Sequence, residues 1–129
     1  MNLTPSAIKL HRKSCILEIS FGDTHYPLAA EYLRVYSPSA EVKGHGPGEE
    51  VLQLNKQTVA ITGIEPLGNY AIKLIFSDGH DSGIYSWEYL QELGANNADK
   101  WQNYLDRVAT HEAQEDAAKT STVKWVGPL

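Results

Sequence analysis

The sequence predicts a single α+β domain in which an antiparallel β-sheet is covered by helices on one side. Runs of alternating apolar and polar residues, the period of a half-buried strand, come in pairs joined by short polar links. The order of segments is strands, a short helix, strands and then helices, without the regular strand–helix alternation of a parallel doubly wound sheet. A length of 129 residues suits one domain with one core.

The first strand pair is expected at residues 7–11 and 15–21, joined by the polar link at 12–14. In the second run, Cys15, Leu17, Ile19 and Phe21 share one face. Cys15 is the only cysteine, which excludes an internal disulfide, and it is expected to be a small buried hydrophobe rather than a nucleophile. The basic run KLHRK is expected to be a solvated hairpin tip, with contact to an anion as the alternative.

A short helix is expected within residues 26–39, YPLAAEYLRVYSPS. Pro27 suits a first helical turn, where its missing N–H costs nothing. Pro38 marks a point by which the helix should have ended. The glycine-rich segment AEVKGHGPGEE that follows is expected to be a loop.

The second strand pair is expected at residues 58–64 and 70–76, because apolar side chains alternate in both runs. Residues 65–68 are expected to connect the two strands, since Pro66 should bar ladder pairing there.

Two helices are expected after this hairpin. Ser86 is a candidate N-cap for the first helix, Glu88 suits its first turn, and Gly94 is expected to end it. The second helix should start near residues 96–97. Its apolar stripe consists of Trp101, Tyr104, Leu105, Val108 and Ala109.

The expected domain spans residues 1–113. Residues 114–129 are expected to form a mobile tail, because they are polar and lack apolar periodicity. Within this tail, VKWV either docks on the domain or a partner, or stays free.

Charge and composition narrow the function. The net charge of −5 argues against broad nucleic-acid binding, which needs several cations on one face. No apolar run approaches the ~20 residues that span a bilayer, and the N-terminus lacks the order of a signal peptide. We therefore expect a cytoplasmic monomer that binds neither nucleic acid nor membrane.

No standard catalytic motif is present: G-x-S-x-G, the Walker loop, H-E-x-x-H and C-x-x-C are all missing. The residues with the most chemical interest are His80, in the turn SDGHDSG, and His45, between two glycines. Either histidine is a turn residue that hydrogen-bonds the backbone, or the two form a metal-binding or acid–base site.

Two stretches together, LRVYSPSAEVKGHGPGEE and YAIKLIFSDGHDSGIYSWEYL, resemble the gamma-butyrobetaine hydroxylase-like N-terminal domain family over roughly residues 5–105. The resemblance implies a small β-rich domain with packed helices. Such domains occur alone in bacteria, or fused to iron- and 2-oxoglutarate-dependent dioxygenases and to P-loop ATPases of iron–sulfur cluster assembly. The iron site of those dioxygenases lies in their other domain, so the resemblance does not imply dioxygenase activity.

In the hydroxylases, the resemblance implies a structural zinc held by three cysteines and one histidine, which follow a Leu-Arg pair. Here Leu33 and Arg34 match that pair, and the ligand positions fall on Ser37, Ser39, Val42 and His80. Serine hydroxyls are poor zinc ligands and valine is none, so we expect no metal and no cofactor. His80 should instead hold two loops together by hydrogen bonds to Ser37, to Ser39 and to the backbone of 40–42, supplemented by His45.

These observations predict a non-catalytic binding or adaptor module with a protein partner, in the setting of metalloenzymes or iron–sulfur assembly proteins. The alternative is a small ligand-binding protein or enzyme that uses the loop around His45 and His80. The candidate binding or loop-clamping residues are His45, His80, Ser37, Ser39 and Arg34.

Overall fold

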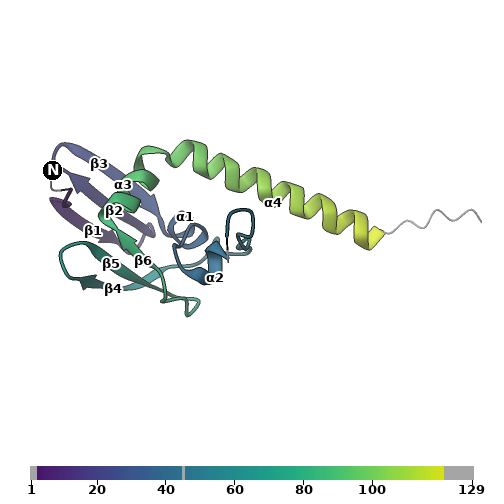
Figure 1. The fold of residues 1–129 in the computed structure, drawn as a ribbon, viewed down its shortest axis with the longest axis horizontal. Coiled ribbons are helices and arrows are strands. Elements are labelled where there is room, and N and C mark those ends of the chain that lie inside the picture. Colours follow the sequence, from purple (N-terminus) through teal and green to yellow (C-terminus); the bar gives the residue numbers. More distant parts are fainter. Residues whose placement is uncertain (1–2, 45, 121–129) are drawn as a thin grey trace, which may run out of the picture. The chain divides into compact units, whose positions relative to one another are not determined.

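The computed structural model describes residues 3–44 and 46–120 (Figure 1). The chain divides into two compact units, Met1–Asn97 and Ala98–Leu129. Along the chain, the elements are β1 Ala7–His11, β2 Ile16–Phe21, β3 Thr24–Ala29, α1 Ala30–Val35, α2 Ala40–Lys43, β4 Ile61–Leu67, β5 Ala71–Phe76, β6 Ile84–Ser86, α3 Trp87–Ala95 and α4 Asn97–Thr120. The α+β class predicted from the sequence is confirmed.

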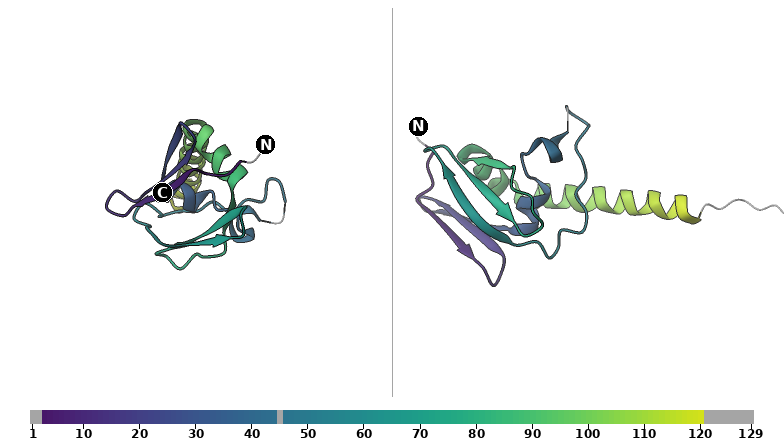
Figure 2. Two further views of the ribbon diagram at one scale, coloured as in Figure 1. Left: turned by 90° about the vertical axis from the view of Figure 1, so that its left-hand side faces the viewer. Right: turned by 90° about the horizontal axis from the view of Figure 1, so that it is seen from below.

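The strands form two antiparallel sheets of three strands, in the orders β1-β2-β3 and β4-β5-β6, rather than the single sheet that we expected. Both are visible in the purple and teal parts of Figure 2. Each predicted hairpin gained a third strand, β3 in the first sheet and β6 in the second.

Strand β3 replaces the first turns of the helix predicted from Tyr26 onward. Pro27 lies in β3 opposite Glu18, and the helix begins only at Ala30. An edge strand tolerates proline because one row of its backbone groups has no ladder partner to lose. Cys15 also differs from the prediction: it is half-buried in the β1–β2 turn, with a positive φ of 55°.

The second sheet corrects the connection predicted at residues 65–68. Strand β4 continues to Leu67, and Pro66 lies opposite Ile72 in the ladder. Like Pro27, Pro66 occupies an edge strand, so its missing N–H breaks no pairing on the outer side. The short strand β6 was not predicted, because three residues are too few for a periodic signal.

Two helices join the sheets through buried tyrosines. The Tyr85 hydroxyl, from β6, donates to the backbone oxygen of Leu33 in α1 at 2.6 Å. The Tyr32 hydroxyl, from α1, donates to the backbone oxygen of Leu93 in α3 at 2.7 Å. The core of the first unit includes the buried side chains of Leu17, Ile19, Leu28, Ile72, Leu74, Phe76 and Leu90.

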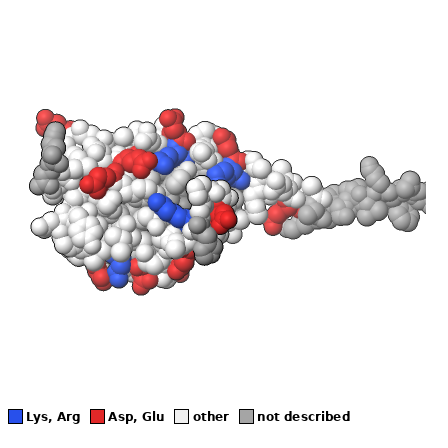
Figure 3. All heavy atoms as spheres, in the orientation of Figure 1, with Lys and Arg blue, Asp and Glu red and all other residues white. Residues whose placement is uncertain are grey.

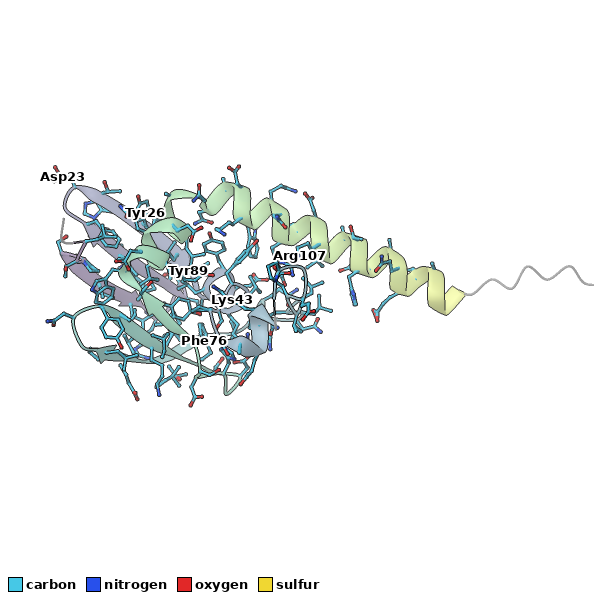
Figure 4. All side chains as sticks on the ribbon, viewed as in Figure 1. Asp23, Tyr26, Lys43, Phe76, Tyr89 and Arg107 are labelled. Atoms are coloured by element: carbon cyan, nitrogen blue, oxygen red, sulfur yellow. The ribbon has the colours of Figure 1, made fainter. Side chains whose placement is uncertain are left out.

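Helix α3 confirms one predicted boundary and corrects the other. The Ser86 side chain accepts a hydrogen bond from the Tyr89 N–H, as an N-cap does. Gly94 does not end the helix, which continues to Ala95. A Cβ at Gly94 would overlap the ring of Tyr26, so this glycine allows α3 to approach β3 closely (Figure 4).

The second unit contains the long helix α4, which continues through Thr120. Residues 114–120, part of the expected tail, are therefore helical. The VKWV segment lies outside the described residues, and the mobility of the tail stays a prediction. No helix in the described part of the chain combines the length and apolar character needed to span a bilayer.

Candidate functional site

The candidate site is a group of polar side chains that we call the His80 cluster: Arg34, Ser37, Ser39, Glu41, Asp78, His80 and Ser82. Helix α1 supplies Arg34, and α2 supplies Glu41. The link between these two helices supplies Ser37 and Ser39. The loop between β5 and β6 supplies the other three. The cluster thus joins two loops that lie about 40 residues apart in sequence.

His80 is enclosed by this cluster, and only 3% of its side chain is exposed. Its Nε2 lies 2.8 Å from Ser37 Oγ, and its Nδ1 lies 3.4 Å from a carboxylate oxygen of Glu41. Ser37 Oγ also accepts the Ser39 N–H at 3.3 Å, so its own proton is free to be donated to Nε2. When Ser37 donates to Nε2, the proton of the neutral ring lies on Nδ1, where it faces Glu41.

Ser39 forms a second link between the same loops. Its Oγ caps α2 by accepting the Glu41 N–H at 3.2 Å, so residues 40–43 form a helical turn where we expected loop. The same Oγ lies 2.8 Å from Ser82 Oγ, which in turn reaches Glu41 Oε1 at 3.4 Å. Each loop therefore contributes both a donor and an acceptor to the junction.

Arg34 and Asp78 add an ion pair beside these hydrogen bonds. Arg34 Nε donates to Asp78 Oδ2 at 2.8 Å, and Lys56 Nζ reaches the same oxygen at 2.7 Å. Burial alone would raise the pKa of Asp78, but hydrogen bonds from Lys56, the His80 N–H and Arg34 together hold it well below its ordinary value. Among the described residues, the buried Nη1 of Arg34 has no acceptor. The ion pair with Asp78 is therefore the main interaction that offsets the cost of burying the Arg34 charge.

The glycines of the DGHDSG turn have identifiable roles. Gly79 adopts a φ of 90°, which disfavours residues with a side chain. A Cβ at Gly83 would overlap Ser37 Oγ, so the backbone of one loop lies directly against the key hydroxyl of the other. The motif is therefore explained by contacts within the cluster.

Helix α2 has a further contact on its other side. Lys43 Nζ lies 4.9 Å from the centre of the Tyr89 ring in α3 (Figure 4). Such a cation–π contact at an exposed site contributes about 0.5–1 kcal/mol. It fixes α2 to α3 while the serines fix it to the β5–β6 loop.

His80 gives the cluster a predicted pH dependence. Burial lowers the pKa of His80 from its ordinary 6.5, with help from Arg34 and against the opposing effects of Glu41 and Asp78. The unfolded chain therefore binds a proton that the folded chain does not. The contribution of neutral His80 to the free energy of unfolding should be fully present above about pH 6.5, and the free energy of unfolding should fall as the pH drops below that value.

Denaturant titrations at pH 7.5 and 5.5 measure this difference. His80→Gln should remove much of the pH dependence, whereas His111→Gln, on α4, should retain it. An equal loss of pH dependence in both variants would contradict the assignment to His80.

The order Ser37–His80–Glu41 is that of a nucleophile, a base and an orienting acid. Ser37 is only 1% exposed, however, and its hydroxyl lies against the backbone of Gly83. A substrate carbonyl has no access to such a nucleophile. The arrangement therefore acts as a clamp between the loops.

The residues at the four zinc positions do not fit zinc. Ser37 and His80 are hydrogen-bonded directly to each other, and Val42 is a buried side chain without a donor atom. Within residues 3–44 and 46–120, no three side chains of His, Cys, Asp or Glu gather as metal ligands do.

The structure brings together Arg34, Ser37, Ser39 and His80, four of the five candidate residues. The fifth, His45, lies outside the described residues. Sequence reasoning missed Glu41, Lys56 and Ser82 as members or neighbours of the cluster. For Ser82, the signal was its place in the same turn as His80, whereas nothing in the spacing pointed to Lys56.

One family profile and several solved structures match the chain. The family profile "Gamma-butyrobetaine hydroxylase-like, N-terminal" matches residues 8–91. A protein solved in solution by NMR is 50% identical, with a TM-score of 0.75 over 84% of this chain and 86% of its own. A second NMR structure is 51% identical, with a TM-score of 0.72 over 84% and 82% of the two chains.

A crystal structure from Acidithiobacillus ferrooxidans ATCC 23270, of a DUF971 protein of unknown function, is 33% identical. Its TM-score is 0.60, over 72% of this chain and 94% of its own. No curated protein matches the chain. The family match covers both motifs that build the His80 cluster, and the chain belongs to the gamma-butyrobetaine hydroxylase-like N-terminal domain family.

Proposed function

We propose that the protein is a non-catalytic binding module that docks on a protein partner. The observation that carries this proposal is the closed state of the His80 cluster: its histidine is 3% exposed and both ring nitrogens face groups of the same chain. The two sequence motifs that build the cluster are thus engaged in contacts between the loops. The protein partner is therefore bound by exposed residues of the domain rather than by the His80 cluster.

The family's other architectures suggest the kind of partner. The resemblance implies fusions of related domains to metal-dependent oxygenases and to iron–sulfur assembly ATPases, and we propose that this chain serves proteins of those kinds. The net charge of −5 favours a protein partner over nucleic acid. We further propose that the free module is a cytoplasmic monomer that binds no membrane.

Affinity capture from native cells, followed by reconstitution with the purified partner, tests this function. The tagged chain should capture one metalloprotein or assembly protein, and the purified pair should co-sediment in a fixed ratio. The same tag on an unrelated domain is the control. The proposal fails if no captured protein binds in purified form.

A second candidate, a small hydrolase, is favoured only by the order Ser37–His80–Glu41. A fluorophosphonate probe, which labels activated serines, separates the two functions. The native protein should remain unlabelled because Ser37 is buried. Labelling that disappears in Ser37→Ala would establish the hydrolase and overturn the binding module.

A further inference from the structure

The β1–β2 hairpin differs in charge from the rest of the chain. Its tip and first strand carry Lys9, His11, Arg12 and Lys13, all exposed, and we call these four residues the basic tip. Residues 1–29 contain three Lys or Arg and two Asp or Glu, whereas the whole chain has a net charge of −5. The acidic excess therefore lies entirely beyond the first sheet. On the face in Figure 3, charges of both signs are interspersed.

The register of the first sheet places this charge on its solvent side. Ile8 and Leu10 alternate with Lys9 and His11, so the charged pair points away from the apolar pair. The carboxylate in the middle of this face, Glu18, is already engaged. His11 Nε2 lies 3.0 Å from it and His25 Nδ1 lies 3.8 Å away, and the hydrogen bond from His11 lowers its pKa.

The three cations of the basic tip remain available to a partner. Within residues 3–44 and 46–120, no ion pair joins Lys9, Arg12 or Lys13 to a carboxylate. Arg12 and Lys13 lie exposed in the turn. Lys9 faces Glu18 across the ladder and helps to lower its pKa, but its side chain is also exposed and can attract a partner's carboxylate.

Strand β1 is also an edge of its sheet. An edge strand directs alternate N–H and C=O groups outward, where an extended peptide can pair with them. Its side chains then meet the residues of the edge strand across the new pair. A peptide added to β1 would therefore place alternate side chains beside Lys9 and His11 and reach Arg12 and Lys13 at its end.

We propose that β1 and the basic tip bind an acidic, extended segment of the protein partner by strand addition. This inference rests on the proposed binding function and names the surface and the chemistry that it uses. A short acidic segment fits better than nucleic acid, because three cations cover only a few residues and the acidic remainder of the chain repels a long polyanion.

A synthetic, fluorescently labelled peptide of alternating Glu and Val residues is the probe, and its anisotropy with the full chain is the measurement. Binding should be detectable at low salt and should weaken as salt rises. The triple variant Lys9→Gln/Arg12→Gln/Lys13→Gln should weaken it about tenfold, the summed effect of three exposed charge pairs. Amide NMR shifts should concentrate in β1 and the turn after it.

The matched control is Lys73→Gln/Lys100→Gln/Arg107→Gln, which removes the same charge from other elements and should change the affinity less than twofold. Equal weakening in both triple variants, or amide shifts away from β1, would overturn the inference. So would tighter binding of duplex DNA or anionic vesicles through the same three residues.

The partner captured with the native chain separates this inference from the proposed function. Loss of that partner from the basic-tip variant supports the surface assigned here. Full retention overturns the surface assignment and leaves the binding function intact.

Discussion

Asp78→Ala should lower the free energy of unfolding by about 2–3 kcal/mol, because it removes the counter-charge of a buried arginine. The Arg34 side chain is only 8% exposed and its Nη1 already lacks an acceptor among the described residues. Asp78 also accepts from Lys56 and from the His80 N–H. The carboxylate is 24% exposed, which keeps the expected cost below that of a fully buried pair. Denaturant titration measures the change.

Two variants locate the effect. Asp81→Ala removes an exposed carboxylate from the same turn and should change the stability by no more than about 0.5 kcal/mol. Arg34→Met/Asp78→Ala removes both charges and should be more stable than Asp78→Ala alone. If the double variant is less stable than the single one, the cost does not arise from an unpaired Arg34.

Gly94→Ala should destabilise the protein by about 2–3 kcal/mol, although alanine is the better helix former by about 1 kcal/mol. The added Cβ would overlap the Tyr26 ring, and α3 would have to move away from β3. That movement would also disturb the hydrogen bond from Tyr32 to Leu93. Thermal and denaturant unfolding both report the change.

Gly46→Ala is the matched control, because a Cβ there would meet nothing within 4 Å. It should be nearly neutral. Tyr26→Ala/Gly94→Ala should be more stable than the sum of the two single changes, because Tyr26→Ala removes the ring atoms that the added Cβ would overlap. A stabilised Gly94→Ala would show that helix propensity outweighs packing at this position and that the close contact is not needed.

The core strands could be predicted from the sequence because one face of each strand is apolar and the other is more polar. Strand β1 has the predicted bounds, and β2 and β5 begin one residue later than predicted. In β5, Ile72, Leu74 and Phe76 are buried, whereas Tyr70, the first residue of the predicted strand, precedes β5 and is 61% exposed. In β2, alternation identified the buried Leu17 and Ile19, but Phe21 on the same face is half-buried and Ser20 on the opposite face is buried.

The errors arose where a local rule competed with a tertiary contact. Pro27 and Pro66 resemble helix or turn signals, but both occupy edge strands, and only the sheet order makes an edge visible. Gly94 resembles a helix stop, but it serves a contact with a residue 68 positions away. Whether the strands form one sheet or two depends on which strands pair with each other, and the local sequence pattern does not specify this pairing.

The site was predicted in part through the family resemblance. The contact between Ser37 and His80 follows from the two positions that hold zinc in the hydroxylases, and the structure has them 2.8 Å apart. Glu41 could not be found this way, because it matches no ligand position. Lys56 reaches Asp78 from the long loop before β4, whose path is not encoded in any periodic pattern.

The central claim is that hydrogen bonds around His80 hold the two loops that zinc holds in related hydroxylases. Metal analysis of the purified protein, with thermal melts in the presence and absence of a chelator, tests it most directly. We predict no stoichiometric metal and melting curves that superimpose, since the domain should fold without a metal ion. One equivalent of zinc, or a melting temperature that falls when the chelator is added, would contradict the account.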